Sequence, residues 1–297
     1  MKFLPVPLRV VLALALVVAH TLVHGSCLFA AALVKLALPF AGFRRACNRL
    51  LAAIAESWIG VNSHLIDVFA RTAFDVGMDA QLRCDGRYLV LANHQSWVDI
   101  LVLQKVFNRR IPLLRFFLKR ELFWVPVLGL AWWALDFPFM RRHTREQIER
   151  RPELAGRDIE TTRRACAKFR DIPVAIMNFV EGTRFTPAKH DAQSSPYRHL
   201  LKPRSGGVAF VLDAMGDALE AILDVTIVYP AGRPTMLDLF AGRIPEVRVE
   251  VRQRAITPDL IGDYQGDAAF RERFQQWMNA LWADKDATFE RLFGGTR

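Results

Sequence analysis

The sequence lacks the motifs of several common enzyme classes. It has neither a Gly-x-Gly-x-x-Gly nor a P-loop pattern, which argues against a nucleotide-dependent enzyme. It has no Gly-x-Ser-x-Gly elbow, which argues against a serine hydrolase of the α/β type. Zinc-finger spacing, a basic zipper and an RNA-binding aromatic pattern are also missing, so nucleic acid is not an expected partner.

Cysteine is scarce and scattered. The four cysteines, Cys27, Cys47, Cys84 and Cys166, lie far apart and include no Cys-x-x-Cys pair. This arrangement predicts neither a disulfide framework nor a zinc site. Isolated core thiols in a reducing compartment are the simpler interpretation, and no metal is expected.

Charge is absent from residues 10 to 34, which contain no Lys, Arg, Asp or Glu. A helix of this length at about 1.5 Å per residue is long enough for a hydrocarbon core of about 30 Å. A secretory signal peptide is the alternative, but the run is long for one, and no Cys-rich sequence follows. We therefore expect residues 1–42 to be a retained membrane anchor, spanning or monotopic, and residues 43–297 to form the catalytic domain.

The charges that are present favour an anionic lipid surface. Lys and Arg number 40 and Asp and Glu 30, a net charge of +10. The larger basic cluster follows the apolar run, at Arg44, Arg45 and Arg49. By the positive-inside rule, this cluster predicts an inner (cytoplasmic) membrane protein with its catalytic domain on the cytoplasmic side.

Short apolar runs alternate with helical patterns in the rest of the chain. Strands are predicted at 86–92, 173–179, 221–229 and around 247–251, and helices at 43–80, 158–169, 206–214 and a stripe from Phe270 to Trp282. Residues 186–203 have the composition of a loop. The alternation predicts an α/β fold with a mixed, largely parallel sheet flanked by helices, beside an N-terminal membrane helix.

His94 and Asp99 are the first candidates for chemistry. An alcohol that attacks a thioester must lose a proton, and imidazole, with an ordinary pKa of about 6.5, is suited to take it. A carboxylate on the other ring nitrogen would fix the tautomer and stabilise the imidazolium. The spacing alone equally suits a capped helix start, with Asn93 or Ser96 as the cap.

Two further segments could bind a substrate. Glu181-Gly182-Thr183-Arg184 directly follows a predicted strand, where α/β folds commonly bind ligands, and its arginine suits phosphate oxygens. Lys119 and Arg120 lie within the apolar segment 111–140. Its uncharged run, residues 122–135, is shorter than the roughly 20 residues of a membrane span, which favours an acyl-chain tunnel wall or an interfacial surface.

These segments resemble the sequence blocks of the glycerophospholipid acyltransferases, the lysophosphatidic acid acyltransferase family. The blocks occur in the family's order, as residues 93–99 (NHQSWVD), 119–123 (KRELF, with Pro126 and Gly129), 179–184 (FVEGTR) and 225–230 (VTIVYP). The resemblance implies a glycerophosphate-acyltransferase-like fold. It also implies transfer of a fatty acyl group from acyl-CoA or acyl carrier protein to the free hydroxyl of a lysophospholipid, most simply 1-acyl-sn-glycerol-3-phosphate, without a cofactor.

The resemblance also implies roles for single residues. His94 would be the general base and Asp99 its orienting partner. Glu181, Gly182, Thr183 and Arg184 would bind the phosphate and glycerol of the acceptor, assisted by Lys119 or Arg120. Phe185 and the long tail after Pro230 lean towards the branch that uses inositol or cardiolipin types of lysophospholipid.

Two other functions remain open at this stage. Water could replace the alcohol, which would make the protein a thioester or lipid-ester hydrolase. A non-catalytic lipid-binding membrane protein would have His94 in a purely structural role.

Overall fold

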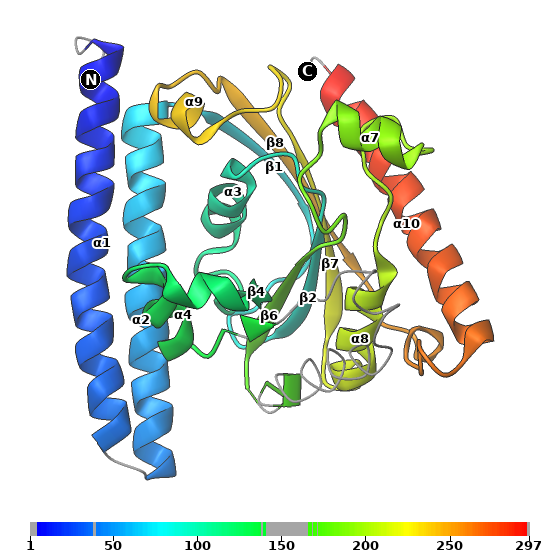
Figure 1. Ribbon diagram of the computed structural model, residues 1–297, viewed down its shortest axis with the longest axis horizontal. Coiled ribbons are helices and arrows are strands. Elements are labelled where there is room, and N and C mark those ends of the chain that lie inside the picture. The colour runs from blue at the N-terminus through cyan, green and yellow to red at the C-terminus, as the bar shows by residue number, and fades with distance from the viewer. Residues whose placement is uncertain are drawn as a thin grey trace.

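The fold is given by a computed structural model that describes residues 5–37, 40–137, 139–140, 166–167, 169–170 and 172–295. At its centre is a six-stranded sheet (Figure 1). Across the sheet the strands are β1 (Ala73–Asp79), β8 (Glu246–Arg254), β7 (Ala221–Val228), β2 (Arg87–Ala92), β6 (Val174–Phe179) and β3 (Leu114–Phe116). Every neighbouring pair is parallel except β7 with β8, which confirms the predicted mixed, largely parallel sheet.

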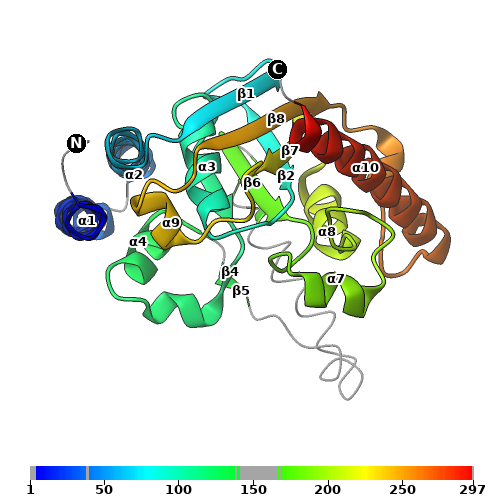
Figure 2. The same ribbon diagram turned by 90° about the horizontal axis from the view of Figure 1, so that it is seen from above.

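Helices cover both faces of this sheet (Figure 2). The helices are α1 (Val6–Ala37), α2 (Ala41–Leu65), α3 (Val98–Phe107), α4 (Leu128–Ala134), α7 (Pro187–Gln193), α8 (Ser205–Met215), α9 (Met236–Phe240) and α10 (Ala268–Gly294). A π-helical turn (Ile66–Ala70), two 3₁₀ turns (Arg120–Trp124 and Pro258–Leu260) and a two-stranded sheet of β4 (Leu118–Lys119) and β5 (Phe139–Met140) complete the described elements.

The core consists of two apolar layers, one on each side of the sheet. Successive side chains of a strand point to opposite faces, so Leu89 and Leu91 of β2 pack with α8 and α10, whereas Val90 packs with α3. The central strands are apolar on both faces because both are covered. The predicted C-terminal stripe is confirmed, since Phe274 and Trp282 are buried against the α8 side.

Helices α1 and α2 pack side by side at one edge of the molecule (Figures 1 and 2). Polar contacts join them within their apolar surroundings: His24 Nε2 lies 3.2 Å from Ser57 Oγ, and Trp58 Nε1 donates to Thr21 Oγ1 at 2.9 Å. Among the described residues, α1 is the one helix long and apolar enough to cross a membrane, judged by length and composition.

Some sequence predictions differ from the structure. The helix predicted over residues 43–80 ends at Leu65 and is followed by a π-helical turn, Ile66–Ala70, and then by β1. Phe74, Val76 and Met78 alternate with polar or small residues, a pattern typical of a strand, which is why this part of the segment forms β1. The predicted 186–203 loop contains α7, and most of the helix predicted at 158–169 lies outside the described residues.

Candidate active site

The candidate site lies where three neighbouring parallel strands end. β2 lies between β6 and β7 and is parallel to both, so the carboxyl ends of the three strands meet at one edge of the sheet. The residues that follow these strands include His94 after β2, Glu181 after β6 and Tyr229 after β7. Such an edge is the usual ligand-binding position of α/β sheets.

His94 and Asp99 form the hydrogen-bonded pair that their spacing allowed. His94 Nδ1 lies 2.9 Å from Asp99 Oδ2, and the Asp99 side chain is fully buried. The same oxygen accepts the backbone N–H of Gln95 at 2.7 Å and that of Ser96 at 2.8 Å. With Nδ1 held by the carboxylate, Nε2 is the ring nitrogen left to exchange a proton with a ligand.

The loop that carries His94 is tied to the sheet and to a second loop. The Asn93 side chain exchanges two hydrogen bonds with the backbone of Ile227, at 2.9 and 2.8 Å. Ser96 Oγ donates to the carbonyl of Pro234 at 2.6 Å and accepts the N–H of Val98 at 3.1 Å. The predicted cap at Asn93 or Ser96 is therefore wrong, because the N-cap position of α3 is Trp97 and makes no side-chain cap hydrogen bond. Ser96 supports the helix start from the preceding position, and Asn93 binds β7.

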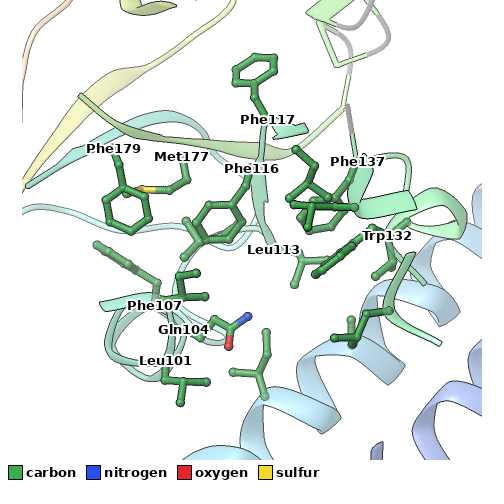
Figure 3. Close-up of a pocket in the computed structure, with 18 of the residues that line it drawn as sticks. Leu101, Gln104, Phe107, Leu113, Phe116, Phe117, Trp132, Phe137, Met177 and Phe179 are labelled. Carbon is green, nitrogen blue, oxygen red and sulfur yellow. The ribbon is translucent and has the colours of Figure 1, made fainter. Parts of the chain in front are cut away.

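The His94 ring faces a large apolar cavity. It stacks on Phe179, with ring centroids 3.9 Å apart, and its side chain is 12% exposed. The cavity has a volume of about 1100 Å³ and extends from His94 between α3 and the helices α1, α2 and α4. Figure 3 shows aromatic and aliphatic side chains around it, among them Phe116, Leu113 and Trp132.

The segment 111–140 supplies much of this wall. Leu113, Phe116, Trp132 and Phe137 all line the cavity. The segment therefore forms a cavity wall, while Trp124 and Trp133 of its uncharged run are exposed. The acyl-chain tunnel and the interfacial surface both stay predictions. Within the segment, α4 packs against α1.

The residues that follow β6 fall into two groups: one supports the loop that carries His94, and the other lines the cavity. Glu181 is fully buried, and its Oε1 accepts the His94 backbone N–H at 3.4 Å. Burial raises the pKa of this carboxyl well above its ordinary value. Gly182, Thr183 and Arg184 line the cavity. Gly182 has φ +68°, and a Cβ there would lie 2.9 Å from Arg204 Cδ, so this position favours glycine.

Basic side chains lie on the cavity wall at Arg184 and next to it. The Arg184 guanidinium lies over the Trp97 ring at 4.5 Å. Lys189 Nζ donates to Thr183 Oγ1 at 2.7 Å, and Arg233 lies over Phe185 at 4.5 Å. Such a cluster can bind an anionic headgroup. Arg204 also lines the cavity. Sequence reasoning missed the three basic residues outside the 181–184 segment, because they come from separate parts of the chain: Lys189 lies in α7, Arg204 directly precedes α8, and Arg233 follows β7.

Of the second predicted basic pair, Arg120 does not line the cavity. Lys119 ends β4, and its side chain lies outside the described part of the molecule. Arg120 begins the following 3₁₀ turn and is exposed. Leu118 and Leu122 on either side of the pair line the cavity.

A buried lysine lies close to the site, and the sequence did not predict it. Lys285 of α10 is 1% exposed and forms an ion pair with Asp224 of β7. Its Nζ also donates to the carbonyl of Val225 at 2.7 Å. Burial lowers the pKa of Lys285, and Asp224 opposes that shift. Within the described residues, no three His, Cys, Asp or Glu side chains are grouped so as to hold a metal ion.

Comparison with known proteins gives consistent matches. The family model described as Acyltransferase matches residues 73–230, more than half of the chain. The chain is similar to 1-acyl-sn-glycerol-3-phosphate acyltransferase 3 of Arabidopsis thaliana, with 28% identity over 221 residues, 69% of this chain and 53% of that protein. It is also similar to 1-acyl-sn-glycerol-3-phosphate acyltransferase gamma of Mus musculus, with 26% identity over 215 residues, 68% of this chain and 52% of the relative. The chain thus spans about half the length of these curated relatives.

The fold is also similar to a solved structure. The crystal structure of the 1-acyl-sn-glycerophosphate acyltransferase PlsC from Thermotoga maritima matches with a TM-score of 0.58 and 14% identity, covering 98% of this chain and 97% of that one. At this identity, the likeness concerns the fold.

Proposed function

Because the chain belongs to the acyltransferase family, we propose that it transfers a fatty acyl group from a thioester carrier to a lysophospholipid hydroxyl. The carrier is acyl-CoA or acyl carrier protein, and the simplest acceptor is 1-acyl-sn-glycerol-3-phosphate, which the names of the relatives specify. The observation that carries the proposal is the His94–Asp99 pair at 2.9 Å, placed at the wall of a long apolar cavity.

In the proposed reaction, His94 Nε2 takes the proton of the acceptor hydroxyl as its oxygen attacks the thioester carbonyl. Asp99 stabilises the imidazolium that forms, since its carboxylate lies on Nδ1. The carbon–sulfur bond then breaks, and the thiolate leaves with the proton held by His94. An ester and a free thiol result, and no covalent enzyme intermediate is needed.

The remaining predicted residues divide into two roles. Thr183 and Arg184 lie at the cavity and are suited to bind the acceptor phosphate. Glu181 is better suited to hold the His94 loop than to touch a substrate, because its carboxyl is buried and contacts the His94 backbone. Gly182 permits the turn between them.

The test of this function is an acyl-transfer assay on the purified full chain in detergent, with oleoyl-CoA or oleoyl acyl carrier protein and a panel of lysophospholipids. Wild type should form an ester only when an acceptor is present, and His94→Ala should not. His64→Ala is the matched control, because His64 is an exposed histidine near the end of α2 and does not line the cavity. Thiol release without acceptor would instead indicate a hydrolase, and lipid binding with no turnover a binding protein.

We also propose that α1 and α2 lie along the membrane surface on the cytoplasmic side of the inner membrane and do not cross it. The catalytic domain contacts α1 near both of its ends. Arg9 donates a hydrogen bond to the carbonyl of Ala241 near one end, and Lys35 pairs with Asp136 at 3.3 Å near the other. The 26 residue steps from Arg9 to Lys35 span about 39 Å. A transverse α1 would therefore pull polar parts of the domain through the hydrocarbon core, which is costly.

Outward-facing apolar side chains of α1, such as Val18 and Leu33, would meet the acyl chains of the bilayer. Phe40, between the two helices, reports the topology, because a transverse hairpin would place it across the membrane. In a background with Cys27 and the other cysteines replaced, Phe40→Cys should react with an impermeant maleimide in inside-out vesicles and not in spheroplasts. The reverse pattern would show that the hairpin crosses.

A further inference from the structure

Two amide side chains, one in α3 and one directly after its last residue, line the otherwise apolar cavity. Gln104 and Asn108 are four residues apart and therefore share one face of the helix. Figure 3 shows the Gln104 amide in the space bounded by Leu101, Phe107 and Leu113. Asn108 lies one helical turn further from the His94 loop.

Both amides carry a buried oxygen that no described residue satisfies. Gln104 Oε1 and Asn108 Oδ1 are inaccessible and accept no hydrogen bond from the described part of the chain. Asn108 is anchored only through its Nδ2, which donates to the carbonyl of Glu56 at 3.2 Å. A buried acceptor without a donor is costly, and a cavity built for methylene groups alone would favour apolar side chains at these positions.

The surroundings of the pair are also more polar than the rest of the cavity. Glu56 of α2 and Arg109 line the same region. Burial raises the pKa of Glu56, and the charge of Arg109 opposes that shift. Several polar groups are thus gathered at a distance from His94, on the part of the cavity wall formed by α2 and the end of α3.

We propose that Gln104, assisted by Asn108, binds a hydroxyl group carried on the acyl chain, so that the enzyme prefers hydroxylated fatty acyl chains. The inference rests on the proposed acyl transfer. A hydroxyl both donates and accepts, so it matches either atom of an amide. Gln104 lines the cavity and its buried amide atom is Oε1, so the hydroxyl would accept a hydrogen bond from Nε2. A plain hydrocarbon chain offers Nε2 no acceptor.

The position of the pair indicates where on the chain the hydroxyl lies. The reacting carbonyl must sit at His94, whose partner Asp99 is in the first turn of α3. Along the helix axis, Gln104 is about 7.5 Å and Asn108 about 13.5 Å beyond Asp99 at 1.5 Å per residue. A chain that follows α3 into the cavity therefore meets the amides several carbons from the thioester.

The experiment compares hydroxystearoyl-CoA isomers, with the hydroxyl at different carbons, against stearoyl-CoA, using the purified full chain and one lysophospholipid. We expect the ratio of kcat/KM, hydroxylated over plain, to be highest for one mid-chain isomer. In Gln104→Leu, this ratio should fall about 3- to 10-fold, the worth of one hydrogen bond. Leu113→Met is the matched control, a volume-conserving change in the same wall that should leave the ratio unchanged.

A second arm uses stearoyl-CoA with a lysophospholipid whose own chain is hydroxylated. A Gln104-dependent preference in this arm alone would show that the cavity holds the acceptor chain. It would support the amide site, with the acceptor chain as the carrier of the hydroxyl. Gln104→Met provides the same test should Gln104→Leu fold poorly. An identical ratio in wild type and both variants, with stearoyl transfer intact, would overturn the inference. Absence of transfer with every donor and acceptor would instead overturn the proposed function.

Discussion

The hydroxyl of Tyr229 donates to Oδ1 of Asp99 at 2.7 Å, on the opposite side of the carboxylate from His94. Asp99 therefore accepts four hydrogen bonds, three on Oδ2 and one on Oδ1. Burial raises the pKa of the Tyr229 phenol well above its ordinary value, and the negative charge of Asp99 adds to the shift. The phenol thus keeps its proton and remains a donor. Tyr229 completes a His94–Asp99–Tyr229 chain that fixes the orientation of the imidazole.

We predict that Tyr229→Phe lowers kcat by about 10- to 100-fold, because a hydrogen bond to a charged group is worth about 1.5–3 kcal/mol. The substitution leaves Asp99 Oδ1 buried without its donor, so the free energy of unfolding should fall as well. Tyr197→Phe is the matched control, since the buried Tyr197 hydroxyl donates to the Asn279 carbonyl at 3.3 Å. Equal kcat in Tyr229→Phe and wild type would remove Tyr229 from the positioning of His94.

Glu181 should make the protein less stable as the pH rises. Its raised pKa means that the folded chain keeps this proton above about pH 4.5, where the unfolded chain loses it. The folded state binds more protons in this window, so the free energy of unfolding falls with increasing pH. Glu181→Gln should remove that contribution.

The measurement is denaturant unfolding of both proteins over a pH series. The stability of wild type relative to Glu181→Gln should decrease upward from about pH 4.5. Glu290→Gln is a control of opposite sign, because a hydrogen bond from His199 lowers the pKa of Glu290, whose stabilisation is lost as pH falls. A difference between wild type and Glu181→Gln that does not vary with pH would contradict the prediction.

Arg184→Ala should raise KM for the phosphate-bearing acceptor and leave KM for the thioester donor nearly unchanged. A charge-assisted contact of this kind is worth about 1.5–3 kcal/mol, so the acceptor KM should rise by about 10-fold or more. Arg110→Ala is the control, because Arg110 is exposed and does not line the cavity. A KM change confined to the donor would show that Arg184 contacts the carrier instead.

The sequence could predict the chemical pair because it is local. His94 and Asp99 are five residues apart, and the strand before them is a short apolar run, so the turn and helix start follow from nearby residues. The largely parallel sheet follows in the same way from the alternation of strands and helices. The 43–80 prediction was wrong because helical periodicity was extended over residues 73–79, which alternate with period two.

The rest of the site depends on contacts between distant residues. Tyr229 meets Asp99 across 130 residues, and Lys285 meets Asp224 across 61. Neither contact has a local signal, because strand order decides which strand ends become neighbours. The unpaired oxygen of Gln104 is equally invisible in the sequence, where a glutamine in a helix usually faces solvent.

Lys285→Met should destabilise the fold strongly. The substitution removes the partner that Asp224 has within the core and leaves the Val225 carbonyl without its donor, although Arg254 still holds Asp224 at 2.9 Å. Loss of one member of a buried ion pair costs about 3–5 kcal/mol, and the remaining arginine argues for the lower end of this range.

Arg291→Met is the matched control, because Arg291 pairs with Glu250 at the exposed surface, where such pairs are worth about 1 kcal/mol or less. Denaturant unfolding of the three proteins in the same detergent measures the difference. If Lys285→Met were as stable as Arg291→Met, the charge on Lys285 would contribute nothing net to the core, and methionine packing would compensate for the lost pair.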